Sequence, residues 1–148
     1  EVLVMTVTQL LRNKGSDVWS VTPETSVFEA LRVMAEKNVG ALVVLERAEL
    51  RGIFSERDYA RKVILHGKSS KDTPVCEIMT EKVDCVSPSH SVRDCMARMT
   101  DKHIRHLPVL EGGGVIGLIS IGDVVKAIIS DQEFMIEQLE SYIAGGSY

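Results

Sequence analysis

The sequence has few aromatic residues and no dense run of basic residues. Aromatic side chains make up 5% of the 148 residues, which leaves few platforms on which the bases of a single-stranded nucleic acid could stack. The formal net charge is −4, so a polyanionic nucleic acid or an anionic membrane surface is disfavoured as a partner. No apolar run approaches the ~20 residues of a membrane-spanning helix. We therefore predict neither a nucleic-acid partner nor a membrane partner.

Cysteine is also scarce, and the first residues lack a targeting pattern. The chain has three cysteines, Cys76, Cys85 and Cys95, and no two of them have the Cys-x-x-Cys spacing. We therefore predict no disulfide framework and no zinc or other metal site. This cysteine usage favours a reducing compartment. Residues 1–5 do not have the pattern of a signal peptide. We expect a cytoplasmic location, with an organelle reached after removal of a leader as the alternative.

What the chain does contain is an internal repeat. Residues 52–58, Gly-Ile-Phe-Ser-Glu-Arg-Asp, recur 65 residues later as residues 117–123, Gly-Leu-Ile-Ser-Ile-Gly-Asp. The same offset relates Pro23 to Pro88 and is kept between them without an insertion. Each copy has the order extended chain, proline, helix, strand, turn, strand, helix, which predicts α/β packing. Because there are only two copies, we predict a pseudo-symmetric pair that shares one core rather than an array.

The repeat also predicts the domain organisation. We expect an N-terminal helix and linker over residues 1–17, a first unit over 18–67, a linker over 68–82, a second unit over 83–130, and a C-terminal helical extension and tail over 131–148. Within the first unit we expect a strand over 18–21 and a last helix over 59–66. The final helix should begin near Gly122 and keep an apolar spacing as far as Ile143. This stripe exceeds what the repeat needs, so we expect it to contact a partner. The alternative is that it folds back on its own chain.

The repeated motifs resemble a tandem of CBS (cystathionine β-synthase) domains, also called a Bateman module. The resemblance rests on Val21-Thr22-Pro23, residues 52–58, Val86-Ser87-Pro88, Arg105-His106-Leu107-Pro108-Val109 and residues 117–123, and it covers about residues 7–130. It implies two pseudo-symmetric α/β (α+β) units, each a small, mostly three-stranded sheet with two helices, packed sheet to sheet. It also implies clefts that bind AMP, ADP or ATP and regulate a protein partner, with no catalysis and no required cofactor.

Both units place a Ser-x-x-Asp sequence where a strand is expected to run into a helix. These are Ser55 with Asp58 and Ser120 with Asp123. A helix N-terminus has unpaired N–H groups that suit a phosphate, and a carboxylate accepts hydrogen bonds from ribose hydroxyls. The same spacing is also a capping box that merely starts a helix. The tandem context favours a nucleotide role for at least one copy. Arg57 either reaches a phosphate bidentately or is a solvated charge of the first helical turn.

The largest chemical difference between the repeats lies at Arg105 and His106, whose counterparts are Gly40 and Ala41. The resemblance implies that basic residues here face the ligand phosphates, and His106 would then bind more strongly below pH ~6.5, when it is protonated. The alternative is a surface arginine and a structural histidine. By resemblance, the remaining pocket residues are Thr22 and Ser87 beside the adenine, with apolar walls from Val39, Ile53, Ile104 and Leu118, each of which could also be plain core.

Other functions remain alternatives to an AMP, ADP or ATP sensor. The ligand could instead be NAD(H) or S-adenosylmethionine, or the clefts could be empty and the chain a structural dimerisation module. An enzyme is disfavoured because no nucleophile lies beside a base in a recognisable local signature. Members of the family commonly pair, so the resemblance also implies a homodimer.

Overall fold

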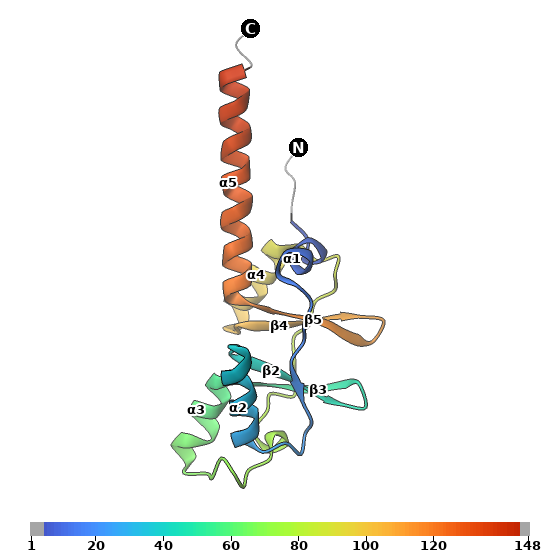
Figure 1. Cartoon of the computed structure of the whole chain (residues 1–148), viewed down its shortest axis with the longest axis vertical. Helices are drawn as coiled ribbons and strands as arrows, with labels where there is room; N and C mark the ends of the chain where they lie inside the picture. The colour runs from blue at the N-terminus through green and yellow to red at the C-terminus, as the bar shows by residue number, and fades with distance from the viewer. Residues whose placement is uncertain (1–4, 146–148) are drawn as a thin grey trace.

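The computed structural model describes residues 5–145, which form two stacked α/β units and a long projecting helix (Figure 1). Residues 1–4 and 146–148, part of the predicted N-terminal segment and tail, lie outside the described residues. In chain order the elements are α1 (Val7–Lys14), β1 (Ser20–Val21), α2 (Val27–Lys37), β2 (Ala41–Glu46), β3 (Glu49–Ser55), α3 (Glu56–Lys62), the 3-10 helices η1 (Ile64–His66) and η2 (Val75–Glu77), α4 (Val92–Lys102), β4 (His106–Glu111), β5 (Gly114–Ser120) and α5 (Ile121–Gly145).

The two sheets differ by one strand. In the first unit β1 lies parallel to β2, and β2 and β3 form an antiparallel hairpin. In the second unit β4 and β5 form the equivalent hairpin, but the third strand is reduced to an isolated bridge between Val86 and Val109. The reason is Pro108. Its counterpart Val43 donates a backbone hydrogen bond to the carbonyl of Trp19 (3.3 Å), and proline has no N–H with which to do so.

The helices begin and end at equivalent positions in the two units. Ser26 and Ser91 are the N-caps of α2 and α4, and each hydroxyl accepts a hydrogen bond from the backbone N–H three residues on. The helix expected over residues 59–66 instead begins at Glu56 and ends at Lys62, followed by the short helix η1. The strand expected over 18–21 is confined to Ser20–Val21.

The segment that precedes each unit packs on the core of the other unit. Helix α1 contributes Val7, Leu10 and Leu11 to the core of the second unit. The segment around η2 contributes Val75, Ile78 and Met79 to the core of the first unit. Each core is therefore completed by chain from outside its own repeat.

This exchange explains the glycine that opens each repeated motif. A Cβ atom on Gly52 would lie 2.8 Å from the carbonyl oxygen of Thr80 and 2.8 Å from Sδ of Met79. A Cβ atom on Gly117 would lie 2.8 Å from Cδ2 of Leu11. The crossing segments therefore approach β3 and β5 closely at positions where a side chain would have no room.

Helix α5 is the most asymmetric feature of the fold. Its first turns pack on the second unit, where Val124 is fully buried and Ala127 and Ile128 lie against the core. Beyond them the helix projects away from both units (Figure 1). Among residues 5–145, no helix is long and apolar enough to cross a membrane.

Candidate functional site

The junction between β5 and α5 holds the second Ser-x-x-Asp sequence. Asp123 Oδ2 accepts a hydrogen bond from the backbone N–H of Ser120 (2.8 Å), and Ser120 Oγ accepts one from the N–H of Asp123 (3.1 Å). Lys14, at the end of α1, donates to Asp123 Oδ2 (2.6 Å) and to the carbonyl of Leu118 (2.8 Å). Lys14 is therefore a site residue that the sequence did not indicate, because its position depends on the crossing of α1 to the second unit.

Asp123 is held in its ionised form at this junction. Burial on its own would raise the pKa of the carboxyl group, but the Lys14 ammonium and the Ser120 N–H outweigh burial and hold the pKa below its usual range. The Asp123 side chain is 23% exposed and that of Lys14 is 32% exposed. A carboxylate that solvent still reaches can exchange the lysine for the hydroxyl groups of a ligand.

His106 and Arg105 lie beside the same junction. His106 begins β4 and its ring faces the first unit, where a Cβ atom on Gly40 would lie 3.7 Å from the ring atoms Cε1 and Nε2. Burial lowers the pKa of His106, the nearby Lys14 and Arg105 charges lower it further, and Asp123 opposes them. The free protein therefore protonates His106 only below the pH of ~6.5 expected from the sequence. The exposed Arg105 anchors the junction through its carbonyl, which accepts from the N–H of Ile121 (2.8 Å).

The equivalent junction of the first unit is closed by the chain itself. Asp58 is 8% exposed. Its Oδ2 accepts from the backbone N–H of Ser55 (3.0 Å), and its Oδ1 accepts from Thr80 Oγ1 (3.2 Å) and lies 3.1 Å from Lys62 Nζ. Ser55 and Asp58 form a complete capping box, and Thr80 and Lys62 are additional partners of the Asp58 carboxylate. Asp58 thus serves the fold in this structure, and a ribose would have to displace Thr80 and Lys62 to reach it.

Arg57 connects the two units. Its Nη1 donates to the carbonyl of His103 (2.6 Å), the residue that caps the C-terminal end of α4. A guanidinium at the negative end of a helix dipole is a stabilising arrangement. The sequence left two roles open for Arg57, a phosphate ligand and a solvated charge. The structure adds a third, which is to hold the two units together.

The remaining predicted pocket residues make local contacts. Thr22 is exposed, and its N–H donates to Thr25 Oγ1 (3.1 Å). The N–H of Ser87 donates to His90 Nδ1 (2.9 Å). The four apolar wall candidates are all partly buried; they are Val39, Ile53, Ile104 and Leu118. The structure therefore gathers Arg105, His106, Ser120 and Asp123, with the Leu118 carbonyl, around one junction. Thr22 and Ser87 instead donate their hydrogen bonds to residues three positions further along the chain.

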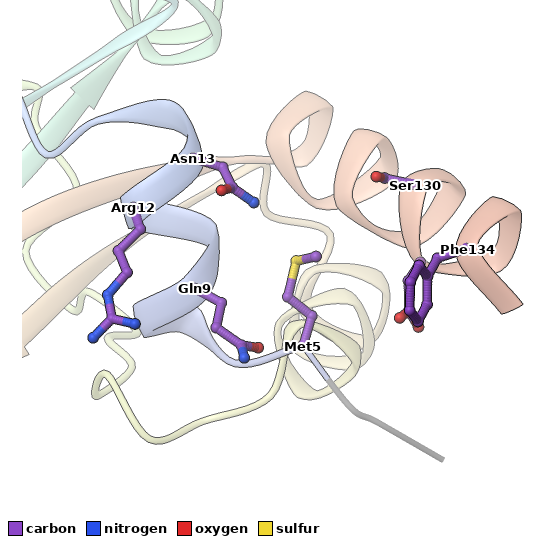
Figure 2. Close-up of a pocket in the computed structure, with 7 residues that line it drawn as sticks. Met5, Gln9, Arg12, Asn13, Ser130 and Phe134 are labelled. Carbon is purple, nitrogen blue, oxygen red and sulfur yellow. The ribbon is translucent and has the colours of Figure 1, made fainter. Parts of the chain in front are cut away.

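Two cavities lie on the second unit, and neither includes a predicted site residue. The larger, of about 480 Å³, lies between α1 and α5, where Met5 and Phe134 face the space between the helices (Figure 2). Its lining residues are Met5, Gln9, Arg12, Asn13, Ser130, Asp131 and Phe134. The smaller, of about 280 Å³, lies between α1 and the β4–β5 hairpin. Both have α1 as a wall, so they too depend on the crossing of the chain.

The described residues offer little for metal or thiol chemistry. No group of three or more His, Cys, Asp or Glu side chains could hold a metal ion in this part of the chain. Burial raises the pKa of the Cys85 and Cys95 thiols, which keeps them protonated and weakly nucleophilic.

Comparison with known proteins agrees with the duplicated architecture. The family profile of the CBS domain matches residues 9–64 and 75–130. The "CBS domain-containing protein CBSX3, mitochondrial" of Arabidopsis thaliana is 43% identical over 95% of this chain and 73% of its own length. The CBS domain-containing protein YhcV of Bacillus subtilis is 30% identical over 79% of this chain and 83% of its own length. A solved structure of a putative signal-transduction protein with CBS domains from Burkholderia ambifaria is 53% identical, covers 86% of this chain and 96% of its own, and has a TM-score of 0.83. The chain therefore belongs to the CBS domain family, as a tandem pair of CBS domains.

Proposed function

We propose that this chain is a regulatory module that binds one adenine nucleotide per chain at the junction of β5 and α5, and that it catalyses no reaction itself. Tandem CBS proteins are in general regulatory modules that bind adenine nucleotides. The observation that carries the proposal is the asymmetry of the two junctions. Asp123 is ionised and partly exposed, whereas Asp58 is buried among its own partners.

Asp123 is the group proposed to bind the ribose. A carboxylate can accept hydrogen bonds from two vicinal hydroxyls, and such charge-assisted bonds are stronger than neutral ones. Lys14 occupies Asp123 Oδ2 at 2.6 Å, so ribose binding moves the Lys14 ammonium off this oxygen. The Lys14 ammonium can then form an ion pair with a phosphate of the ligand.

Three basic side chains are proposed to serve the phosphates. Lys14, Arg105 and His106 all act electrostatically within this junction. The first unit has Gly40 and Ala41 where the second has Arg105 and His106, so only the second junction combines a ribose acceptor with phosphate donors. Guanidinium and imidazolium groups next to the positive end of α5 suit a phosphorylated ligand.

The positive charge at the junction also ranks the possible ligands. AMP, ADP and ATP match a site with one carboxylate and several basic groups. NAD(H) carries phosphates as well and is the closest rival. S-Adenosylmethionine has no phosphate and would leave Arg105 and His106 without a function. A regulated protein would respond to the ligand through its different affinity for two arrangements of the module.

Calorimetric titration of the chain with AMP, ADP, ATP, NADH and S-adenosylmethionine tests the proposal. We expect one adenine nucleotide to bind per chain, and Arg105→Ala to weaken AMP far more than adenosine. Equal losses for the two ligands would remove the phosphate role of Arg105. Absence of binding by all five compounds would favour a structural module with empty clefts. Chromatography of the same mixtures after incubation tests catalysis, and a new product would refute a purely regulatory role.

A further inference from the structure

Helix α5 carries an apolar stripe that its own chain leaves uncovered. The most exposed aliphatic side chains along it are Val125 (40%), Ile129 (51%), Ile136 (53%), Leu139 (60%) and Ile143 (72%). Val124, on the neighbouring face of the helix, is fully buried against the second unit. The stripe therefore lies beside the face that anchors α5, and it continues along the part of α5 that projects from the body of the protein (Figure 1).

The spacing of the stripe is that of a coiled coil. With Gln132 included, its positions alternate by four and three residues from 125 to 143, the a and d positions of a heptad repeat. Ile129, Ile136 and Ile143 fall on a positions, and the d positions hold Val125, Gln132 and Leu139. Isoleucine at a with leucine at d favours two parallel strands, and a single polar residue in the seam fixes register.

We propose that a second copy of this chain covers the stripe, with the two α5 helices parallel and in register as a short two-stranded coiled coil. From residue 125 to residue 143 the seam is about 27 Å long at the helical rise. Helices in proteins owe most of their stability to the packing of an amphipathic face, so the projecting turns need a partner for stability. The inference does not depend on nucleotide binding.

The polar residue in the seam of α5 favours the parallel orientation. Lys126, Glu133 and Glu140 occupy e positions, whereas the g positions hold Ile128, Met135 and Tyr142. In a parallel pair an e residue faces a g residue of the other helix, so each glutamate lies beside an apolar side chain. In an antiparallel pair e faces e, which would place Glu133 beside Glu133 of the other helix but Lys126 beside Glu140. The e charges therefore do not decide the orientation, but Gln132 does: a parallel pair in register places its amide beside the same amide of the other helix, whereas an antiparallel pair places it against Ile136.

The same charges argue against other occupants of the stripe. After Lys126, α5 has no basic residue and carries Asp131, Glu133, Glu137 and Glu140. An anionic membrane would repel this helix, since membrane-surface helices carry lysine and arginine on their polar face. A second copy has the matching apolar heptads without requiring a complementary charge.

Sedimentation equilibrium of the full chain tests whether this seam holds a dimer. We expect a dimer whose dissociation constant rises at least ~tenfold in Ile136→Lys, because the ammonium would have to be desolvated in the seam. Gln138→Lys is the matched control: it adds the same charge two residues away, at an exposed c position, and should leave the dimer intact. Circular dichroism and thermal unfolding check that both variants keep the fold. A monomer at all concentrations, or a dimer that Ile136→Lys leaves unchanged, would overturn the proposal.

Disulfide formation tests the orientation. In a Cys76→Ser background, which removes the exposed native thiol, Ile143→Cys should form a disulfide-linked dimer under mild oxidation. The parallel seam places residue 143 of one copy beside residue 143 of the other. An antiparallel seam packs a positions against d positions, so it would instead cross-link a mixture of Ile129→Cys and Leu139→Cys chains as heterodimers while each variant alone stays reduced. That result would overturn the parallel arrangement.

Discussion

The two aspartates of the repeat should respond to the same substitution in opposite ways. Asp123→Ala is expected to weaken AMP binding with little loss of stability, whereas Asp58→Ala is expected to lower stability with little change in affinity. Asp123 is partly exposed and its protein partners are one lysine and one backbone N–H. Asp58 is 8% exposed and is the acceptor for Ser55 and Thr80.

The size of each effect can be estimated from the hydrogen bonds that each carboxylate accepts. Hydrogen bonds to a charged group contribute about 1.5–3 kcal/mol, so loss of the ribose acceptor at Asp123 should raise the AMP dissociation constant by about 10- to 150-fold. The Lys14–Asp123 ion pair is partly solvated and stabilises the fold by about 1 kcal/mol or less. Asp58→Ala leaves Thr80 and the Ser55 N–H without their acceptor in a buried place, which should cost about 1–3 kcal/mol of unfolding free energy.

Isothermal titration calorimetry gives the affinities of both variants, and urea denaturation gives their unfolding free energies. The reasoning would be refuted if Asp58→Ala lost AMP binding while Asp123→Ala kept it, because the first junction would then hold the nucleotide. Equal loss of affinity in two stable variants would show that both junctions bind, contrary to one nucleotide per chain.

Three further predictions concern the same junctions and the turns beside them. Because burial lowers the pKa of His106 from 6.5 and a bound phosphate raises it, AMP should bind more tightly as the pH falls through about 6.5, and His106→Gln should flatten that dependence in calorimetric titrations. Ala48→Gly should raise the unfolding free energy in urea by about 0.5–1 kcal/mol, since Ala48 has φ 66° where its counterpart is Gly113, φ 82°; Gly113→Ala should lower it. Gly52→Ala should cost about 1–3 kcal/mol in the same assay, and more than Gly117→Ala, because a backbone oxygen blocks the first Cβ and a flexible leucine side chain blocks the second.

His106 also predicts a pH dependence of the free protein. Its pKa is lower folded than the value of 6.5 that it has when exposed, so the unfolded chain binds the proton first as the pH falls. The stability associated with neutral His106 is therefore complete above about pH 6.5 and declines below it. In thermal unfolding, the stability of the wild type relative to His106→Gln should fall as the pH drops through this range and become independent of pH where the histidine is protonated in both states.

The family and the order of elements could be predicted because they are carried by local patterns. The constant offset between the two Ser-x-x-Asp sequences revealed the duplication, and the same offset between Pro23 and Pro88 showed how far the repeat extends. The CBS family and the mixed α/β fold are confirmed. The missing third strand of the second sheet follows from Pro108, whose lack of an N–H matters only once its partner strand is known. The cytoplasmic location and the protein partner stay predictions.

The composition of the site depended on long-range packing, which local patterns do not contain. Lys14 lies 109 positions before Asp123 in the chain, and it reaches the junction only because α1 crosses to the other unit. The same crossing builds both cavities. The lowered pKa of His106 likewise comes from burial, which the Lys14 and Arg105 charges reinforce and the Asp123 charge opposes. A pattern of residues within one repeat cannot show either effect.

A crystal structure of the chain soaked in a mixture of adenine nucleotides tests the central claim most directly. The account predicts a nucleotide at the β5–α5 junction, with ribose hydroxyls on the Asp123 carboxylate, phosphates toward Arg105 and His106, and Lys14 moved from Oδ2. A nucleotide bound at Asp58 alone, or a junction in which Lys14 still holds Asp123 at saturating ligand, would contradict it.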